Sequence, residues 1–491
     1  MADIVLATLN ARYSHASLGL RYLLANLGPL QSRAEILEFV IGARIESLAE
    51  RILERRPVIL GLGVYIWNVE ETTQLISILR QLAPELRIVV GGPEVSHEIA
   101  AQAICRMADH VITGAAEGEF AALCEQILAW KAGAGPRPLT HVIVGGSQPP
   151  EALTLPYSLY SDDDIAHRNL YIEASRGCPY RCEFCLSALD RTAVPFDLPR
   201  LLGELDQLHR RGARVFRFVD RTFNLRIEQS LAILHFFLER NATHPDSPCF
   251  AHFELVPDHL PNKLREVLPH FVPGTLQFDI GIQTWNPDVQ ELISRRQDNA
   301  RAEANLRWLR EHTTAHLHVD LIVGLPGETL ESFGAGFNRL AALSPHEIQV
   351  GILKRLRGAP IVRHTESHAM RYNPNPPYNV LATSAIDFPT MQRLARFARY
   401  WDLVGNSGRF APRLPQLLGS EPFERFLAFS DWIYERTDST WRLAPDRLAQ
   451  LIDEWLISRG EISFHHGTPP KNGQRRRQDR HTGHRAPGIS A

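Results

Sequence analysis

The sequence has little cysteine, no long apolar run and no excess of one charge. Lys and Arg number 53 against 55 Asp and Glu, so no overall positive field favours nucleic acid or an anionic membrane. No apolar run is long enough to span a bilayer, and residues 1–7 lack the basic segment and long apolar core of a secretory signal. Six cysteines in 491 residues are too few for a disulfide framework, which is typical of a reducing compartment. These absences predict a cytoplasmic protein with no membrane or nucleic-acid partner.

Three of the six cysteines, Cys178, Cys182 and Cys185, form a C-x3-C-x2-C pattern in a loop that contains Gly and Pro. Their thiolates can converge on one point, which suggests a metal. A 4Fe-4S cluster usually takes four thiolates, and a structural zinc site also has four ligands. Three ligands would leave one iron of a cluster open to bind another molecule. A zinc loop and an unligated cysteine group are the alternatives. The other cysteines are expected to be small buried apolar side chains: Cys105, Cys124 and Cys249.

This loop resembles that of the radical S-adenosylmethionine (radical SAM) superfamily, in which an aromatic residue, here Phe184, precedes the last cysteine. The resemblance implies that the three cysteines hold a 4Fe-4S cluster whose open iron binds S-adenosylmethionine. Reduction would then release a 5'-deoxyadenosyl radical that abstracts hydrogen from an unactivated carbon.

Residues 1–135 alternate short β-rich runs with helical periods. Strands are expected at 4–9, 36–40, 58–64, 88–90 and 110–113, and helices at 17–27, 45–55, 69–83, 96–107 and 119–130. The alternation predicts a Rossmann-like parallel sheet covered on both faces. Ligands of such sheets lie beyond the carboxyl ends of the strands. The candidate residues there are Asn10, Trp67, Gly91, Gly92, Glu94 and Glu117. No G-x-G-x-x-G follows the first strand, so a dinucleotide fingerprint is absent.

The strand ends resemble the cobalamin-binding domain that precedes the barrel in one large group of radical SAM enzymes. The segments that carry the resemblance are LNARYSHASLGLRYL, VYIWN, VVGGPEVS and GAAEGEF. The resemblance implies bound cobalamin, held through contacts around its nucleotide tail. No D-x-H-x-x-G is present, so no motif histidine is offered to cobalt, and His15 and His97 are expected to be solvated or hydrogen-bonded. The alternative is a scaffold domain that binds no corrin.

A Gly- and Pro-rich linker is expected at 136–169, with a short edge strand at 141–146, and the alternation then resumes over 170–356. Six strands are predicted at 170–174, 215–219, 250–256, 276–282, 317–323 and 348–353. They resemble the partial (β/α)6 barrel of the radical SAM superfamily, in which chemistry lies at the carboxyl ends of the strands.

Distinctive polar residues fall at those strand ends. The order GIQT, Arg295, DLIVGLPGET resembles the usual family succession. A carboxylate at Asp220 can accept hydrogen bonds from the ammonium of S-adenosylmethionine, and the Arg295 guanidinium can grip its carboxylate. Glu254 and Gln283 can bind ribose hydroxyls or fix the cluster loop. The turn with Gly324 and Gly327 lets adenine approach the backbone. Solvated rim charges and a simple turn are the alternative interpretation.

Residues 357–462 are predicted to form a helical C-terminal domain that begins with a loop at 357–384. Tyr378 and His368 in that loop are candidates for substrate contact, although the pattern favours solvated positions. Helical periods at 390–404, 423–437 and 445–460 place their aromatic residues in a core. The tail at 463–491 is basic and has no apolar period, which predicts disorder.

Together these features predict a radical SAM enzyme with a cobalamin domain, most plausibly a methyltransferase acting on an unactivated carbon. Cyclisation or rearrangement without methyl transfer, and a cobalamin or redox sensor without turnover, are the alternatives. Methylthiotransferase chemistry is disfavoured because the N-terminal region has no second cysteine trio. The expected partners are a small-molecule substrate of undetermined class and an electron donor such as flavodoxin or ferredoxin.

Overall fold

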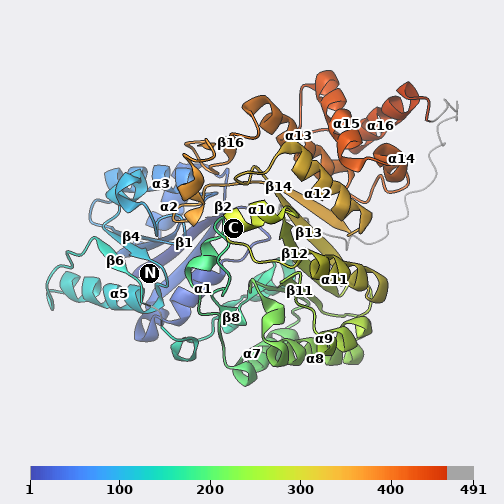
Figure 1. Ribbon diagram of the computed structural model, residues 1–491. Helices are drawn as coiled ribbons and strands as arrows, with labels where there is room; N and C mark the ends of the chain where they lie inside the picture. The colour runs from blue at the N-terminus through green and yellow to red at the C-terminus, as the bar shows by residue number, and fades with distance from the viewer. Residues whose placement is uncertain (1, 147, 462–491) are drawn as a thin grey trace, which may run out of the picture.

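The computed structural model describes residues 2–146 and 148–461, which form three parts along the chain (Figure 1). An N-terminal α/β part lies beside a central α/β part, and a group of helices forms the C-terminal end. Within the described ranges, no helix is both long and apolar enough to cross a membrane. The basic tail predicted at 463–491 lies outside the described residues.

Six parallel strands form the N-terminal sheet, in the order β2-β1-β3-β4-β5-β6. All seven residues of the second strand in this order, β1, are buried, because both faces of a covered parallel sheet need apolar side chains. The predicted strands are confirmed, including the short edge strand. Their bounds are Ile4–Asn10 (β1), Ala34–Val40 (β2), Ile59–Gly63 (β3), Arg87–Gly91 (β4), His110–Thr113 (β5) and Val142–Val144 (β6).

Helices cover both faces of this sheet. One face packs against α1 (Leu18–Ala25) and α5 (Glu117–Lys131), and the other against α2 (Ile45–Leu53) and α3 (Val69–Leu82). The helix predicted at 96–107 is wrong in its first half. It is replaced by a short 3-10 turn, Ile99–Ala101, and only α4, Ala103–Met107, is helical. Between these two elements Gln102 has an extended backbone, and its side chain donates to the backbone oxygens of Glu94 and His97 at 2.9 and 2.7 Å.

The central sheet also has six parallel strands, in the order β14-β13-β12-β11-β10-β7. Strands of this sheet that follow one another along the chain are therefore neighbours, and the two outer strands do not pair with each other, as in the predicted partial barrel. The bounds are Leu170–Ile172 (β7), Val215–Phe218 (β10), Phe250–Leu255 (β11), Leu276–Gln283 (β12), His316–Val323 (β13) and Glu347–Ile352 (β14). The connecting helices are Leu198–Arg210 (α7), Ile227–Thr243 (α8), Asn262–Val267 (α9), Pro287–Leu292 (α10), Asn299–His312 (α11) and Leu330–Ala342 (α12).

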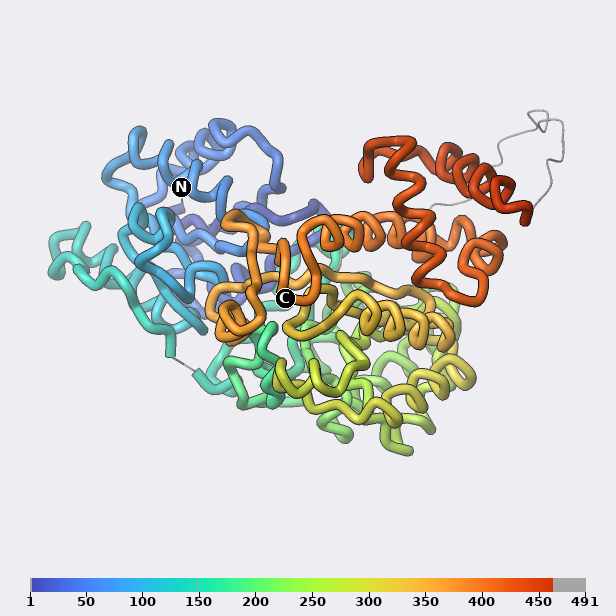
Figure 2. Tube along the Cα trace, turned by 45° about the horizontal axis from the view of Figure 1, so that its top comes forward, coloured from blue at the N-terminus to red at the C-terminus, as the bar shows by residue number. Residues whose placement is uncertain are grey.

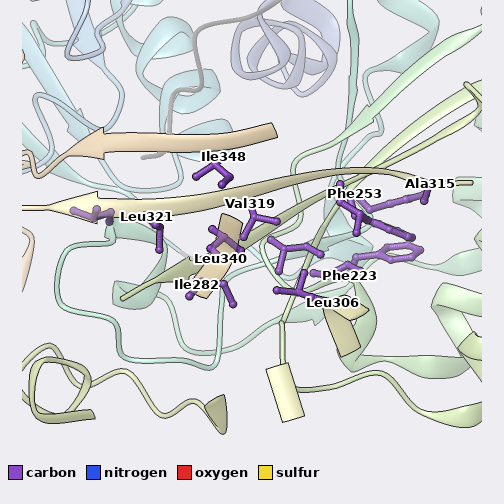
Figure 3. Close-up of a cluster of buried hydrophobic side chains, with 14 of the residues drawn as sticks. Phe223, Phe253, Ile282, Leu306, Ala315, Val319, Leu321, Leu340 and Ile348 are labelled. Atoms are coloured by element: carbon purple, nitrogen blue, oxygen red, sulfur yellow. The ribbon is translucent and has the colours of Figure 1, made fainter. Parts of the chain in front are cut away.

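Figure 3 shows the apolar core between these strands and their helices. Phe253 of β11 stacks on Phe223 with 3.8 Å between ring centroids. Val319 of β13 packs in the same buried cluster as Leu306 of α11 and Leu340 of α12. Burial of such side chains stabilises each by about 1.5–3 kcal/mol, which fixes the strands that carry the site residues.

Up to residue 461, four α-helices follow the central sheet: Phe388–Val404 (α13), Leu414–Leu418 (α14), Pro422–Thr437 (α15) and Pro445–Ser458 (α16). The expectation that their aromatic residues form a core is confirmed for Trp401, which meets Phe337 of α12 edge to face at 4.8 Å. Asn406, just after α13, pairs with both backbone groups of Ile348 at 3.0 Å. The Asn406 side chain thus pairs with backbone groups that would otherwise be unpaired at the open edge of β14.

Two segments expected to be loops carry secondary structure. The linker contains α6 (Asp162–His167), whose signal in the sequence is the capping box of Ser161 and Asp164. The segment 357–384 contains a 3-10 turn, Pro360–His364, and a hairpin of β15 (Arg371–Tyr372) and β16 (Val380–Ala382). Figure 2 shows this segment lying between the N-terminal part and the rest of the chain.

Candidate active site

The cysteine loop leaves the sheet after β7 and is fixed by a buried carboxylate. Asp220, which follows β10, accepts from the Ala174 amide at 2.9 Å and from the Ser175 hydroxyl at 2.6 Å, and also from the Ser175 amide. Gly177 then turns the chain with φ +92°, and a Cβ there would lie 2.8 Å from the Ala193 amide nitrogen. Only glycine suits this turn.

The three predicted cluster ligands line one cavity of about 540 Å³. Cys178 and Cys182 are buried and Cys185 is half-buried, and all three are free thiols. Burial raises the pKa of Cys178 to about 11, so this thiol is protonated at neutral pH until a metal displaces the proton. The predicted burial of the other three cysteines is confirmed: Cys105, Cys124 and Cys249.

The donor set fits an iron–sulfur cluster better than zinc. A zinc ion needs ligands that converge on one point, and no three His, Cys, Asp or Glu side chains do so within residues 2–146 and 148–461. Cys178, Cys182 and Cys185 line one cavity, and the thiols are close enough for their charges to interact, while their convergence on a bound metal stays a prediction. A 4Fe-4S cluster instead takes one thiolate at each iron, which separate thiols on one cavity wall can provide.

Two guanidinium groups lie beside these thiols. Arg295 Nη1 is 3.5 Å from Cys182 Sγ, and its Nη2 donates to the Gly281 carbonyl. Arg221 lines the same cavity and pairs with Glu254 at 2.8 Å. Positive charge next to thiolates stabilises their ionised form, so both arginines favour an anionic cluster.

The remaining barrel predictions divide into two groups. Phe184, Glu254, Gln283 and Arg295 line the cavity with the cysteines. Asp220 does not, because its carboxylate faces the start of the cysteine loop and a separate smaller pocket. The ammonium-binding role predicted for Asp220 is not supported by this placement, and the residue braces the loop instead.

Gly324 and Gly327 also lie outside the cavity lining. Both have positive φ, +85° and +79°. A Cβ at Gly324 would lie 2.5 Å from the Val380 side chain, and one at Gly327 would lie 2.9 Å from Leu292. These glycines allow close packing of the turn after β13, and the expected approach of adenine to this turn stays a prediction.

The N-terminal candidates divide in the same way. Asn10 and Trp67 line the cavity, where the Trp67 ring stacks on Tyr65 at 4.5 Å. Gly91, Gly92, Glu94 and Glu117 do not line it. At Gly92, φ is +112° and a Cβ would lie 2.5 Å from the Val64 carbonyl oxygen, so a tight turn requires this glycine.

Glu94 and Glu117 connect the N-terminal part to the rest of the chain. Glu117 accepts from Arg176 of the cysteine loop at 2.8 Å. Glu94 accepts from Arg357 at 2.8 Å and from the hydroxyl of Tyr378 at 2.7 Å. The expectation of a solvated Tyr378 is therefore wrong, since the side chain is buried.

Sequence reasoning missed several cavity residues. The expectation that His15 is solvated or hydrogen-bonded is confirmed, because its Nδ1 bonds to the Tyr171 hydroxyl. It also lines the cavity, where its buried Nε2 has no partner among the described residues. The floor of the cavity carries His252, Asp279 and Asp320, with Asp279 2.8 Å from His252. The sequence does contain a signal for these residues. His252 and Glu254 lie two residues apart on one predicted strand, and His318 and Asp320 on another, so the members of each pair point to the same face of the sheet.

The cavity therefore joins the two α/β parts. Its N-terminal wall lies beyond the carboxyl ends of β1 and β3, where a ligand of such a sheet is expected. The wall consists of an aromatic pair and the loop after β1, and it faces the thiols of the central part across one space. This arrangement fits a flat cofactor on the N-terminal side and a cluster on the barrel side.

Comparison with known proteins agrees with this geometry. Residues 172–339 match the radical SAM superfamily, and residues 4–124 match the B12 binding domain. The chain is 26% identical over 352 residues to the cobalamin-dependent radical SAM methyltransferase TokK of Streptomyces tokunonensis, covering 65% of this chain and 50% of TokK. It is 26% identical over 343 residues to 2-(S-pantetheinyl)-carbapenam-3-carboxylate methyltransferase of Streptantibioticus cattleyicolor, covering 65% of this chain and 49% of that protein.

Among solved structures, the cobalamin-dependent S-adenosylmethionine radical enzyme OxsB with aqua-cobalamin bound has the same fold. Its TM-score is 0.65 at 14% identity, over 93% of this chain and 75% of OxsB. The present chain spans about half the length of the two curated methyltransferases.

The fold and site define a member of the radical SAM superfamily. With its N-terminal B12-binding domain, the chain belongs to the cobalamin-dependent radical SAM subgroup. Membership implies a 4Fe-4S cluster and S-adenosylmethionine at the barrel and cobalamin at the N-terminal part, as the sequence predicted.

Proposed function

We propose that this protein is an enzyme that transfers a methyl group to an unactivated carbon of a small molecule. The observation that carries the proposal is the single cavity lined both by Cys178, Cys182 and Cys185 and by Trp67 of the N-terminal part. When bound, the cluster and S-adenosylmethionine supply hydrogen abstraction, and cobalamin supplies methyl transfer. The similarity to two curated methyltransferases supports this choice.

The chain's own residues would bind and orient these groups. The three cysteines would hold the cluster, and Arg295 and Arg221 would offset its negative charge. Arg295 is also the candidate for the carboxylate of S-adenosylmethionine, and Glu254 and Gln283 for its ribose. Trp67 and Tyr65 would form an apolar wall that keeps water from the reacting groups.

The test is anaerobic reconstitution of the full chain with iron, sulfide and cobalamin, followed by metal counting. We expect about four irons per chain and stoichiometric cobalt in the desalted protein. Reduction by flavodoxin or ferredoxin, the electron donors in this proposal, should then yield 5'-deoxyadenosine. Methyl transfer from S-adenosylmethionine labelled with deuterium in its methyl group should give S-adenosylhomocysteine and a deuterated product.

Other results would point to other functions. Iron without cobalt, with 5'-deoxyadenosine formed, would favour a cyclisation or rearrangement enzyme whose N-terminal part is a scaffold. A fully loaded protein that forms no 5'-deoxyadenosine on reduction would favour a cobalamin or redox sensor.

A further inference from the structure

A second cavity, of about 490 Å³, lies at the open edge of the barrel beside β14. It shares Phe184, Asp320 and Gln349 with the cofactor cavity, so the two spaces adjoin. Its outer wall is α13, which contributes the small side chains Ala395 and Ala398. The helical C-terminal part therefore forms one side of a space that opens beside the radical site.

One lysine lines this second cavity. The chain has 53 basic residues of the Lys and Arg type, and only four are lysines: Lys131, Lys263, Lys354 and Lys471. Lys131 and Lys263 form ion pairs with glutamates at 3.0 and 2.6 Å, and Lys471 lies outside the described residues. Lys354 lines the cavity, and its ammonium has no ion pair or hydrogen bond within residues 2–146 and 148–461.

The other charged groups of this cavity are engaged. Arg399 pairs with Asp402 at 3.1 Å, and Asp320 lies 3.5 Å from His318. Glu347 lies 3.2 Å from His316, and Arg12 is also engaged. The Lys354 ammonium is thus the charged group of the cavity that lacks a counter-charge in the described part of the chain.

Asn379 stands directly beside it. Lys354 and Asn379 form an antiparallel bridge, flanked by hydrogen bonds from Arg355 to Tyr378 at 3.0 Å and from Val380 to Leu353 at 2.8 Å. Bridge partners project their side chains from the same face, and both line the cavity. The Asn379 Oδ1 is buried and has no partner among the described residues.

Lys354 is half-buried, and partial burial of an unpaired ammonium costs free energy. The pKa of Lys354 is accordingly lowered by burial. An anionic ligand would remove the cost of the unpaired ammonium, since it pairs with that group, and it can also accept from the Asn379 Nδ2.

We propose that the second cavity is the substrate site and that Lys354, with Asn379, binds an anionic group of the substrate, a carboxylate or a phosphate ester. The inference rests on the proposed function, because it places the substrate next to the radical site. It also gives the C-terminal part a role, since α13 forms the wall opposite the barrel.

The test uses the full chain labelled with [ε-13C]lysine, which gives four side-chain signals. Lys354→Arg identifies one of them by its loss. We expect the Lys354 signal to titrate at a lower pH than the others. Inorganic phosphate or acetate, added as probes, should raise its midpoint, and the probe that acts at lower concentration identifies phosphate ester or carboxylate as the recognised group.

Two controls make the test decisive. The Lys263 signal should not respond, because that side chain is exposed and paired with Glu228. Asn379→Ala should weaken the binding of the effective probe to Lys354 by about threefold to tenfold, the loss of one hydrogen bond. The proposal is overturned if neither probe moves the Lys354 signal, or if Lys263 responds equally. The titration of the Lys354 signal and the effect of Asn379→Ala can both be measured without turnover. A protein that forms no 5'-deoxyadenosine would therefore contradict the proposed function but not the anion site.

Discussion

The Tyr378 hydroxyl donates a 2.7 Å hydrogen bond to Glu94, although 284 residues separate the two in sequence. Burial, together with the neighbouring carboxylate, raises the pKa of Tyr378 to about 12, so the hydroxyl stays protonated and remains a donor. Glu94 follows β4 of the N-terminal sheet, and Tyr378 belongs to the hairpin segment after the barrel. The bond therefore fastens the N-terminal sheet to the hairpin segment that follows the barrel.

Tyr378→Phe should lower the free energy of unfolding by about 1–2 kcal/mol, because it removes one donor from a buried carboxylate. Urea unfolding followed by circular dichroism measures this loss. Tyr372→Phe, in the same segment, is the matched control. Its hydroxyl contacts the Met370 sulfur at 3.2 Å, a weak acceptor, so its loss should be smaller. Equal losses of unfolding free energy in the two variants would show that the hydrogen bond to Glu94 adds no more stability than the contact of Tyr372.

Gly177→Ala should prevent the cysteine loop from holding a cluster. The substitution meets both a left-handed φ and a backbone atom 2.8 Å away, so the loop must move. Gly203→Ala in α7 is the control, because no atom lies within 4 Å of its added Cβ and alanine favours a helix by about 0.5–1 kcal/mol. We expect iron bound after reconstitution to fall severalfold in the first variant and to stay unchanged in the second.

Cys178→Ala, Cys182→Ala and Cys185→Ala should each abolish formation of 5'-deoxyadenosine. Each removes one of three ligands from a cluster that has no spare cysteine nearby. Cys249→Ala, a buried change outside the cavity, should retain the iron and the product. A cluster of unaltered iron content and activity in Cys178→Ala would disprove the ligand assignment.

Much of this architecture could be predicted from the sequence, because apolar runs at β1 and β12 identify strands without any knowledge of their neighbours. Local patterns also identified the cysteine loop. They could not identify the environment of Asp220, since only the fold brings Ser175 to its carboxylate. The same holds for Tyr378 and Glu94, because a polar residue in a Pro-rich loop resembles a solvated one until its distant partner is known.

Trp67→Ala should reduce cobalamin retention. The Trp67 ring stacks on Tyr65 and its Nε1 donates to the Leu9 carbonyl at 3.1 Å, so it forms a fixed apolar surface on the N-terminal wall. Trp130→Ala is the control, because that ring lies on α5 away from the cavity. Cobalt per chain after desalting should fall only in the first variant. Equal retention would remove Trp67 from the cofactor site.

Asp320 and Asp279 on the cavity floor should respond to pH in opposite directions. Burial raises the pKa of Asp320 to about 7, whereas an unfolded aspartate titrates near pH 3.9. The folded state therefore prefers the protonated carboxyl, and stability is greatest below about pH 4 and falls as the pH rises towards 7. The side chain in Asp320→Asn does not ionise, so this variant does not lose stability as the pH rises. The difference in unfolding free energy between the variant and the wild type should therefore rise by about 1–4 kcal/mol between pH 4 and pH 7.

For Asp279, burial acts in the same direction, but the hydrogen bond and charge of His252 outweigh it and hold the pKa below its usual range. Its contribution is present above the unfolded pKa of about 3.9 and is lost on acidification. Asp279→Asn should therefore be less stable than the wild type at pH 7, and the difference should shrink below pH 4. Thermal unfolding of both variants across this range tests the pair. The two carboxylates lie on the same cavity floor and share one neighbour, His318. If the stability of both variants changes with pH in the same way, the charge states of the two carboxylates are set by the cavity as a whole.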